Sequence, residues 1–317
     1  MNINHEDFEK LAIGGDGYFT VGKNGVEQIL LSKDKKVEFI FLEDQTMAFV
    51  RSALGYPAFY PVLTVKIEKP VKAVLMDLDG TSVRSEDFWI WIIEQSTANL
   101  LDNPAFQLED DDLPFVSGHS VSEHLEYCIK KYCPDKPLEE ARAHYMRNTR
   151  REMKKILEGR GKENAFVPVE GLKDFLYALK ERKIKIGLVT SGLYEKAWPE
   201  IVAAFRTLEM GNPAEFYDAI ISAGFPLQKG ASGTLGELQA KPHPWLYAET
   251  AKVGLGIDFS DRHSVVGMED SGAGVCSVRL AGFSCLGMSG GNIIQSGLKS
   301  LCSDFCDNFD QMLEIIN

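Results

Sequence analysis

The stretch AVLMDLDGTSV, residues 73–83, joins an apolar run to an abrupt polar end. Two aspartates, Asp77 and Asp79, stand one residue apart and are followed at once by Gly80 and Thr81. A short apolar run bounded by turn-forming residues is typical of a strand buried on both faces. The sequence therefore predicts a buried strand whose carboxyl end directs two carboxylates into one small space.

Apolar runs of the same kind recur downstream and alternate with amphipathic segments. The strand-like runs are IKIGLV (184–189), YDAIIS (217–222), SVVGM (264–268) and FSCLGM (283–288). Helical patterns lie between them, for example over 171–183 and 244–254. Such alternation is typical of parallel sheets with helices on both faces, so we predict an α/β fold with a Rossmann-like, doubly wound parallel sheet.

A long helical region separates the first of these strands from the second. Its helix-like patterns cover 88–101, 121–132 and 137–157, which is more chain than a connection needs. Loops at the carboxyl ends of parallel strands face the ligand crevice, and an insertion there forms a lid. We therefore expect a helical cap over 85–167 and an α/β core formed by 71–84 and 168–317.

Residues 1–70 have a different pattern. Asn24 and Gly25 form a turn signal between two strand-like runs, and a third run covers 36–42. The segment 44–54 is interpreted as a helix. The prolines that follow it indicate a linker: Pro57, Pro61 and Pro70. We expect a small β-rich extension that carries no chemistry.

Composition narrows the class of protein. The net charge of −12 argues against nucleic acid or an anionic membrane as the main partner. No apolar run in the 317 residues approaches the length that spans a bilayer, and the N-terminal MNINHEDFEK lacks the pattern of a secretory signal. The six cysteines form no Cys-x-x-Cys pair, and Cys302 and Cys306 are interpreted as helix packing. We expect free thiols in a reducing cytoplasm.

Polar side chains gather where the predicted strands end. The carboxyl ends of parallel strands share one edge of a sheet, so these side chains should converge. The set is Asp77, Asp79, Thr190, Ser191, Gly192, Lys241, Glu269 and Asp270.

Such a set suits phosphoryl transfer. Clustered carboxylates repel one another unless a cation holds them, and hard oxygen ligands favour Mg²⁺. One carboxylate can attack phosphorus and form an aspartyl-phosphate, while a second transfers protons to the leaving oxygen and from water. A hydroxyl, a backbone N–H and a lysine can hold the phosphoryl oxygens as negative charge grows on them.

Four motifs, in this order along the chain, resemble the haloacid dehalogenase superfamily. They are MDLDGT (76–81), LVTSG (188–192), KPHPWLY (241–247) and GMEDSGAG (267–274). The resemblance covers residue 71 to the C-terminus, with the helical insertion where the branch of β-phosphoglucomutase and phosphoglycolate phosphatase has its cap. It implies Mg²⁺-dependent hydrolysis of a small phosphorylated metabolite, such as a sugar phosphate or a phosphoglycolate-like compound.

The resemblance also implies roles for the acidic residues. Asp77 would be the nucleophile and a metal ligand. Asp79 would be the general acid and base, with its backbone carbonyl on the metal. Asp270 would bind Mg²⁺ directly, and Glu269 would bind it directly or through water.

Phosphate binding is implied for a second group of residues. Thr190, Ser191 and Gly192 would bind the phosphoryl group, while Lys241 would neutralise it and steady the nucleophile. His119 falls in the cap stretch that faces the active site in similar proteins, which implies contact with the substrate.

Departures from the family pattern favour simple hydrolysis. Trp89 stands where the mutases of this branch have a histidine, and Val121 stands where they have a basic residue. Residues 225–239 form a longer segment than is usual before the motif lysine, and we interpret it as a loop near the cleft. A phosphomutase and a catalytically idle binding or regulatory protein on the same fold stay as alternatives.

Overall fold

The structure is a computed structural model that describes residues 4–52, 55–116, 121–223 and 240–317. Internal contacts divide the chain into two compact units. The first unit contains Met1–Ser82, Val169–Tyr194 and Asn212–Asn317, and the second contains Val83–Pro168 and Glu195–Gly211. Every residue placed at the predicted strand ends belongs to the first unit.

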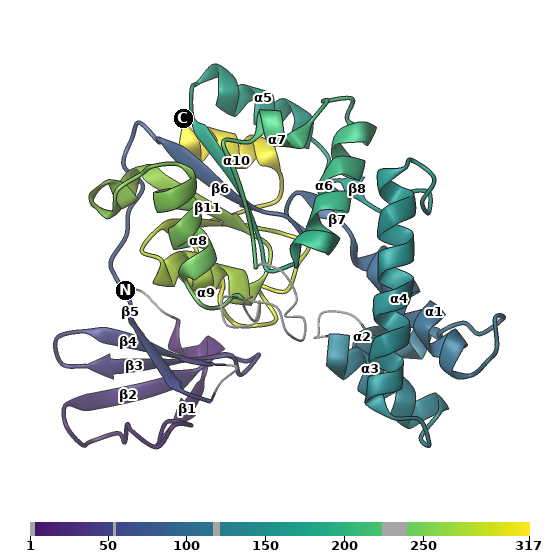
Figure 1. The fold of residues 1–317 in the computed structure, drawn as a ribbon. Helices are drawn as coiled ribbons and strands as arrows, with labels where there is room; N and C mark the ends of the chain where they lie inside the picture. The colour runs from purple at the N-terminus through teal and green to yellow at the C-terminus, as the bar shows by residue number, and fades with distance from the viewer. Residues whose placement is uncertain (1–3, 53–54, 117–120, 224–239) are drawn as a thin grey trace. The chain divides into compact units, whose positions relative to one another are not determined.

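A six-stranded parallel sheet forms the centre of the first unit (Figure 1). Its strands are β6 (Ala73–Asp77), β9 (Lys185–Thr190), β10 (Ala219–Ser222), β11 (Val265–Glu269), β12 (Ser284–Met288) and β13 (Asp304–Cys306). The order β10-β9-β6-β11-β12-β13 puts the first strand between β9 and β11. The strand order therefore reverses at β6, and a crevice for ligands is expected at its carboxyl end.

Helices cover both faces of this sheet, as predicted for a doubly wound fold. Figure 1 shows α8 (Trp245–Glu249) and α9 (Gly272–Leu280) on one side of it. On the other side, α5 (Leu172–Glu181) and α10 (Phe309–Ile316) pack together through stacked Phe175 and Phe309 rings 4.8 Å apart. Short helices complete the unit: the π-helical turn Thr250–Gly254 after α8, α7 (Pro213–Phe216) and the 3-10 helices His5–Asp7, Phe259–Ser264 and Lys299–Leu301.

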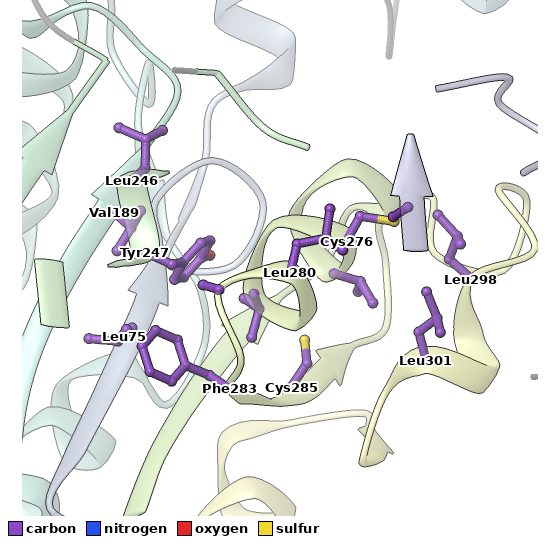
Figure 2. Packing of buried hydrophobic residues seen from close by; sticks show 14 of the residues in the cluster. Leu75, Val189, Leu246, Tyr247, Cys276, Leu280, Phe283, Cys285, Leu298 and Leu301 are labelled. Atoms are coloured by element: carbon purple, nitrogen blue, oxygen red, sulfur yellow. The ribbon is translucent and has the colours of Figure 1, made fainter. Parts of the chain in front are cut away.

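The main apolar cluster lies between the sheet and the helices of the first face. Figure 2 shows Leu75 of β6 and Val189 of β9 meeting Leu246 and Tyr247 of α8, with Leu280 of α9 nearby. Leu75, Val189, Leu246 and Tyr247 are fully buried. This packing holds the strands and the α8 segment in a fixed relation.

A five-stranded antiparallel sheet precedes the core. Its strands follow the chain order: β1 (Glu9–Leu11), β2 (Val26–Leu31), β3 (Val37–Leu42), β4 (Thr46–Arg51) and β5 (Pro57–Pro61). The β-rich extension is thus confirmed, and the strand within 36–42 is confirmed as β3. The prediction of a strand directly before Asn24 is wrong, because this segment makes only an isolated bridge, between Ile13 and Thr20.

One other interpretation of the extension is wrong, and a second is wrong in part. The segment 44–54 contains strand β4 instead of a helix. Ala48 and Val50 are buried in the main cluster while Phe49 is buried in a second one, so both faces are apolar and no alternation marks the strand. The first part of the predicted linker is strand β5, whose terminal Pro57 and Pro61 are tolerated because β5 is an edge strand. Residues 62–72, which include Pro70, contain no helix or strand.

The cysteine interpretation also needs correction. Cys306 lies in strand β13, and Cys302 follows a 3-10 helix, so the pair does not pack on a common helix. Sheet pairing with β12 gave this segment a strand conformation that its short length did not reveal. All six cysteines are free thiols in the structure.

The second unit is built mainly from helices. They are α1 (Glu86–Leu100), α2 (Leu113–Val116), α3 (Val121–Tyr132), α4 (Leu138–Leu157) and most of α6 (Tyr194–Thr207), with the 3-10 helix Asp110–Asp112 and the short pair β7 (Val83–Arg84) and β8 (Val167–Pro168). Asn148 of α4 donates to Ser96 and Asn99 of α1, which ties two helices together. The three predicted helices are confirmed. Among the residues that the structure describes, no helix is long and apolar enough to cross a membrane.

Candidate active site

The register of the parallel sheet brings three functional positions to one edge. Asp77, the last residue of β6, lies opposite Val189 of β9, and Met76 lies opposite Met268 of β11. Glu269, the next residue of β11, is therefore level with Asp77, and Thr190, the next residue of β9, lies one residue beyond that level. Residues more than a hundred positions apart in sequence become neighbours because parallel strands all end at one edge.

Lys241 joins the ends of β6 and β11. Its ammonium hydrogen-bonds to Asp77 Oδ1 and lies 2.6 Å from Glu269 Oε1. Only 7% of its side chain is exposed. Burial acts against the charged form, but Asp77 and Glu269 outweigh it and raise the pKa of Lys241 above its ordinary value. The lysine is therefore a permanent cation beside two carboxylates.

Three carboxylates lie close enough to one another to share a metal ion. Ligand oxygens of Asp77, Glu269 and Asp270 all lie within 4.8 Å of one another. Burial, followed by the charge of Glu269, raises the pKa of Asp77 well above its ordinary value, and the same two causes raise the pKa of Asp270 to about 7. Negative charges held this close are stabilised by a divalent cation, and oxygen donors suit Mg²⁺. The residues present therefore fit the predicted metal.

Gly80 lets the chain turn closely beneath this cluster. Its φ of +86° lies in the left-handed region, and a Cβ there would come within 2.0 Å of Asp270 Oδ2. Thr81, the next residue, has its hydroxyl 3.4 Å from Asp270 Oδ1. The Asp-Gly-Thr sequence is thus matched to the carboxylate of a distant motif, since only glycine fits both the angle and the space.

Glu269 is fully buried and is held by protein donors at both oxygens. Tyr247 donates to Oε1 at 2.5 Å, and the Ser271 hydroxyl donates to Oε2 at 3.1 Å. Gly274 makes room for this carboxylate, because a Cβ there would lie 1.9 Å from it. Sequence reasoning gave no role to Tyr247 or Ser271, although both lie inside quoted motifs. Tyr247 is 22 positions from Glu269 in sequence, while Ser271 is only two positions away and contacts it through the turn after β11.

Asp79 has a more open setting than Asp77. Its side chain is exposed, whereas Asp77 is 5% exposed. The Thr190 hydroxyl lies 3.4 Å from Asp79 Oδ2 and accepts a hydrogen bond from the Gly192 backbone N–H at 2.8 Å. An exposed carboxyl group can exchange protons with water, while a buried one is shielded from it, so the two aspartates suit different tasks.

The remaining predicted phosphate-binding residues divide into two sets. Ser191 lies at the same edge, where its hydroxyl accepts a hydrogen bond from the backbone N–H of Lys241 at 3.1 Å. His119 and the loop 225–239 lie outside the described residues. The structure therefore brings together every predicted residue of the core motifs, while the predicted substrate contact from the cap stays a prediction.

Comparisons with known proteins agree with this arrangement. Residues 71–280 match the family model of haloacid dehalogenase-like hydrolases. Validoxylamine A 7'-phosphate phosphatase from Streptomyces hygroscopicus subsp. limoneus is 25% identical over 231 residues, which cover 69% of this chain and 85% of that protein.

Two solved structures share the fold. A predicted phosphoglycolate phosphatase from Haemophilus somnus 129PT has a TM-score of 0.59 at 17% identity, covering 78% of this chain and 99% of its own. CbbY from Rhodobacter sphaeroides, in complex with phosphate, has a TM-score of 0.53 at 19% identity, covering 76% of this chain and 96% of its own. At these identities the likeness concerns the fold.

Proposed function

Because the chain belongs to the haloacid dehalogenase-like hydrolases, we propose that it is a Mg²⁺-dependent phosphatase that acts through an aspartyl-phosphate on Asp77. The observation that carries the proposal is the buried contact of Asp77 with Lys241 beside Glu269 and Asp270. The phosphatase among the similar proteins supports the same reaction class. The hydrolase class predicted from the motifs is confirmed by the family match.

Mg²⁺ would be held by the side chains of Asp77 and Asp270 and by the backbone carbonyl of Asp79, with Glu269 next to them. When bound, the ion neutralises the carboxylates and the phosphoryl oxygens that approach them. Glu269 already receives hydrogen bonds at both oxygens from this chain's own donors. Binding of Glu269 to the metal would therefore compete with its ion pair to Lys241 and with the hydrogen bond that it accepts from Tyr247.

In the first step, a carboxylate oxygen of Asp77 attacks phosphorus and the bond from phosphorus to the ester oxygen breaks. Asp79 gives its proton to the leaving oxygen, which departs as an alcohol. Thr190 orients the Asp79 carboxyl group through its hydroxyl. Lys241 and the backbone at Ser191 and Gly192 hold the phosphoryl oxygens while their negative charge grows.

In the second step, the Asp79 carboxylate accepts a proton from water and the resulting hydroxide attacks phosphorus. The bond between phosphorus and Asp77 breaks, which releases inorganic phosphate and restores both aspartates. Exposure of Asp79 provides access to water for this step. The helices of the second unit would supply the lid that excludes bulk water during transfer.

The substrate we propose is a small phosphorylated metabolite, such as a sugar phosphate or a phosphoglycolate-like compound. Similar proteins include a phosphatase whose name specifies a 7'-phosphate and CbbY in complex with phosphate. The net charge of −12 disfavours nucleic acid as a substrate. We also propose a cytoplasmic location, which the free cysteines support.

Asp77→Asn tests the proposal. With p-nitrophenyl phosphate and Mg²⁺, the variant should lose at least about 10³-fold in kcat, since the nucleophile is gone. After an acid quench, mass spectrometry should find one added phosphoryl group on the peptide containing Asp77 in the native protein. Removal of Mg²⁺ with EDTA should abolish turnover, and its return should restore it.

The same assay separates the alternatives. A phosphomutase would convert a sugar phosphate to its isomer and release little inorganic phosphate. An idle binding protein would show no turnover and no phosphorylated Asp77. Hydrolysis that persists unchanged in Asp77→Asn would overturn the proposal.

A further inference from the structure

We infer that the N-terminal sheet positions Lys241 for catalysis, through a hydrogen bond between Tyr60 and His243. The inference rests on the proposed function, which gives Lys241 its task. The family match begins at residue 71, so strands β1 to β5 lie outside it. Their contact with the motif segment therefore involves residues that the family match does not cover.

Strand register directs Tyr60 toward the core. Phe39 of β3 lies opposite Ala48 of β4, and Ala48 lies opposite Tyr60 of β5. Residues directly opposite one another share a face of the sheet. Phe39 and Ala48 belong to the main cluster that also contains Leu246 and Tyr247, and Tyr60 packs against that cluster. Tyr60 thus reaches the segment that follows Lys241.

The imidazole of His243 is held by the N-terminal sheet. The Tyr60 hydroxyl lies 2.8 Å from His243 Nδ1, and the two rings meet edge-on at 5.9 Å. The backbone of Arg51, at the end of β4, makes a hydrogen bond to the same histidine. Burial lowers the pKa of His243, which favours the neutral ring, and a neutral imidazole can accept one hydrogen bond while donating another.

Further contacts clamp the peptide around His243. The indole N–H of Trp245 donates to Tyr60, and the two rings pack edge-on at 6.0 Å. The Ser277 hydroxyl of α9 donates to the His243 carbonyl oxygen at 2.5 Å. Tyr60 of the N-terminal sheet therefore holds the side chains of His243 and Trp245. Ser277 of α9 holds the backbone of the same segment at the His243 carbonyl.

This grip matters because Lys241 must stay beside Asp77. The lysine lies two residues before His243, and a small displacement of a catalytic group lowers the rate more than it lowers substrate binding. A second contact between the sheet and the core, from the Lys33 N–H to the Ser296 carbonyl at 3.1 Å, anchors the sheet independently of Tyr60. Tyr60 is thus a positioning residue whose loss should leave the sheet attached.

Tyr60→Phe tests the inference because it removes only the hydroxyl. We expect kcat to fall by about threefold to tenfold with KM unchanged, as suits the loss of one hydrogen bond. Tyr56→Phe is the matched control: Tyr56 is 74% exposed, lies four positions earlier and should retain full activity. Amide hydrogen exchange over residues 241–247 should speed up in Tyr60→Phe and stay unchanged in Tyr56→Phe.

A double-mutant cycle with His243→Ala isolates the pair. If the two side chains act through one another, adding Tyr60→Phe to His243→Ala should lower kcat little further. Equal exchange and equal kcat in Tyr60→Phe and the native protein would overturn the inference while the proposed function stands. A native protein without phosphatase activity would overturn the proposed function, and the exchange measurement would still decide whether Tyr60 holds the segment.

Discussion

In the parallel sheet all six strands run the same way, whereas neighbours in the N-terminal sheet alternate in direction. The parallel arrangement delivers Asp77, Thr190 and Glu269 to one edge. The antiparallel arrangement spreads its strand ends over two edges, and within its described residues it gathers no comparable acidic cluster. The N-terminal sheet contributes to the site through Tyr60, a side chain on the face that packs against the main cluster.

The two sheets also differ in where their buried residues pack. Ile40 and Phe49 of the N-terminal sheet form a small cluster of their own, away from the main one. Leu75 and Val189 of the parallel sheet belong to the main cluster, directly behind the residues of the active site. Effects on catalysis should therefore be largest at the parallel edge and smallest on the outer face of the N-terminal sheet.

Lys241→Met should have the largest effect among the three variants that follow. It removes the cation between Asp77 and Glu269 while keeping much of the side-chain volume, and we expect kcat to fall by about 10²-fold to 10³-fold. Lys252→Met, which alters an exposed pair with Asp258, is the control and should be fully active. Near-native kcat in Lys241→Met would show that the parallel edge is not the catalytic edge.

Tyr247→Phe should have an intermediate effect. Loss of the hydrogen bond to Glu269 leaves a buried carboxylate with one donor fewer, which corresponds to about a tenfold fall in kcat. Steady-state kinetics with p-nitrophenyl phosphate, together with thermal unfolding, would separate a catalytic effect from a loss of stability. A lowered melting temperature with unchanged kcat would limit Tyr247 to a structural role.

Ile40→Val should have the smallest effect on catalysis. Loss of one buried methylene should cost about 0.5–1.5 kcal/mol of unfolding free energy, with kcat unchanged at 25 °C. Ile186→Val in β9 is the matched substitution in the parallel sheet, since both isoleucines are fully buried. Denaturant unfolding measures the free energy of unfolding of both variants. A fall in kcat for Ile40→Val alone would mean that the outer face of the N-terminal sheet also acts on the site.

Local sequence patterns determined a large part of this protein. The apolar run before Asp77, the alternation of strands with helices and the four motifs were sufficient to predict the doubly wound core and the family. They also identified the residues that meet at the carboxyl edge of the sheet, because all strands of a parallel sheet end at the same edge. Short antiparallel strands such as β4 and β5 were missed, since burial on both faces and terminal prolines hide the period of two.

Contacts between distant segments were decided only by tertiary structure. Nothing near Glu269 in sequence indicates that Tyr247 and Lys241 hydrogen-bond or pair with its carboxylate, and nothing near His243 indicates that Tyr60 will reach it. Strand register and the packing of α8 set both arrangements, and register depends on pairings across the whole sheet. Chemistry could therefore be predicted residue by residue, whereas the support that holds those residues in place required the folded chain.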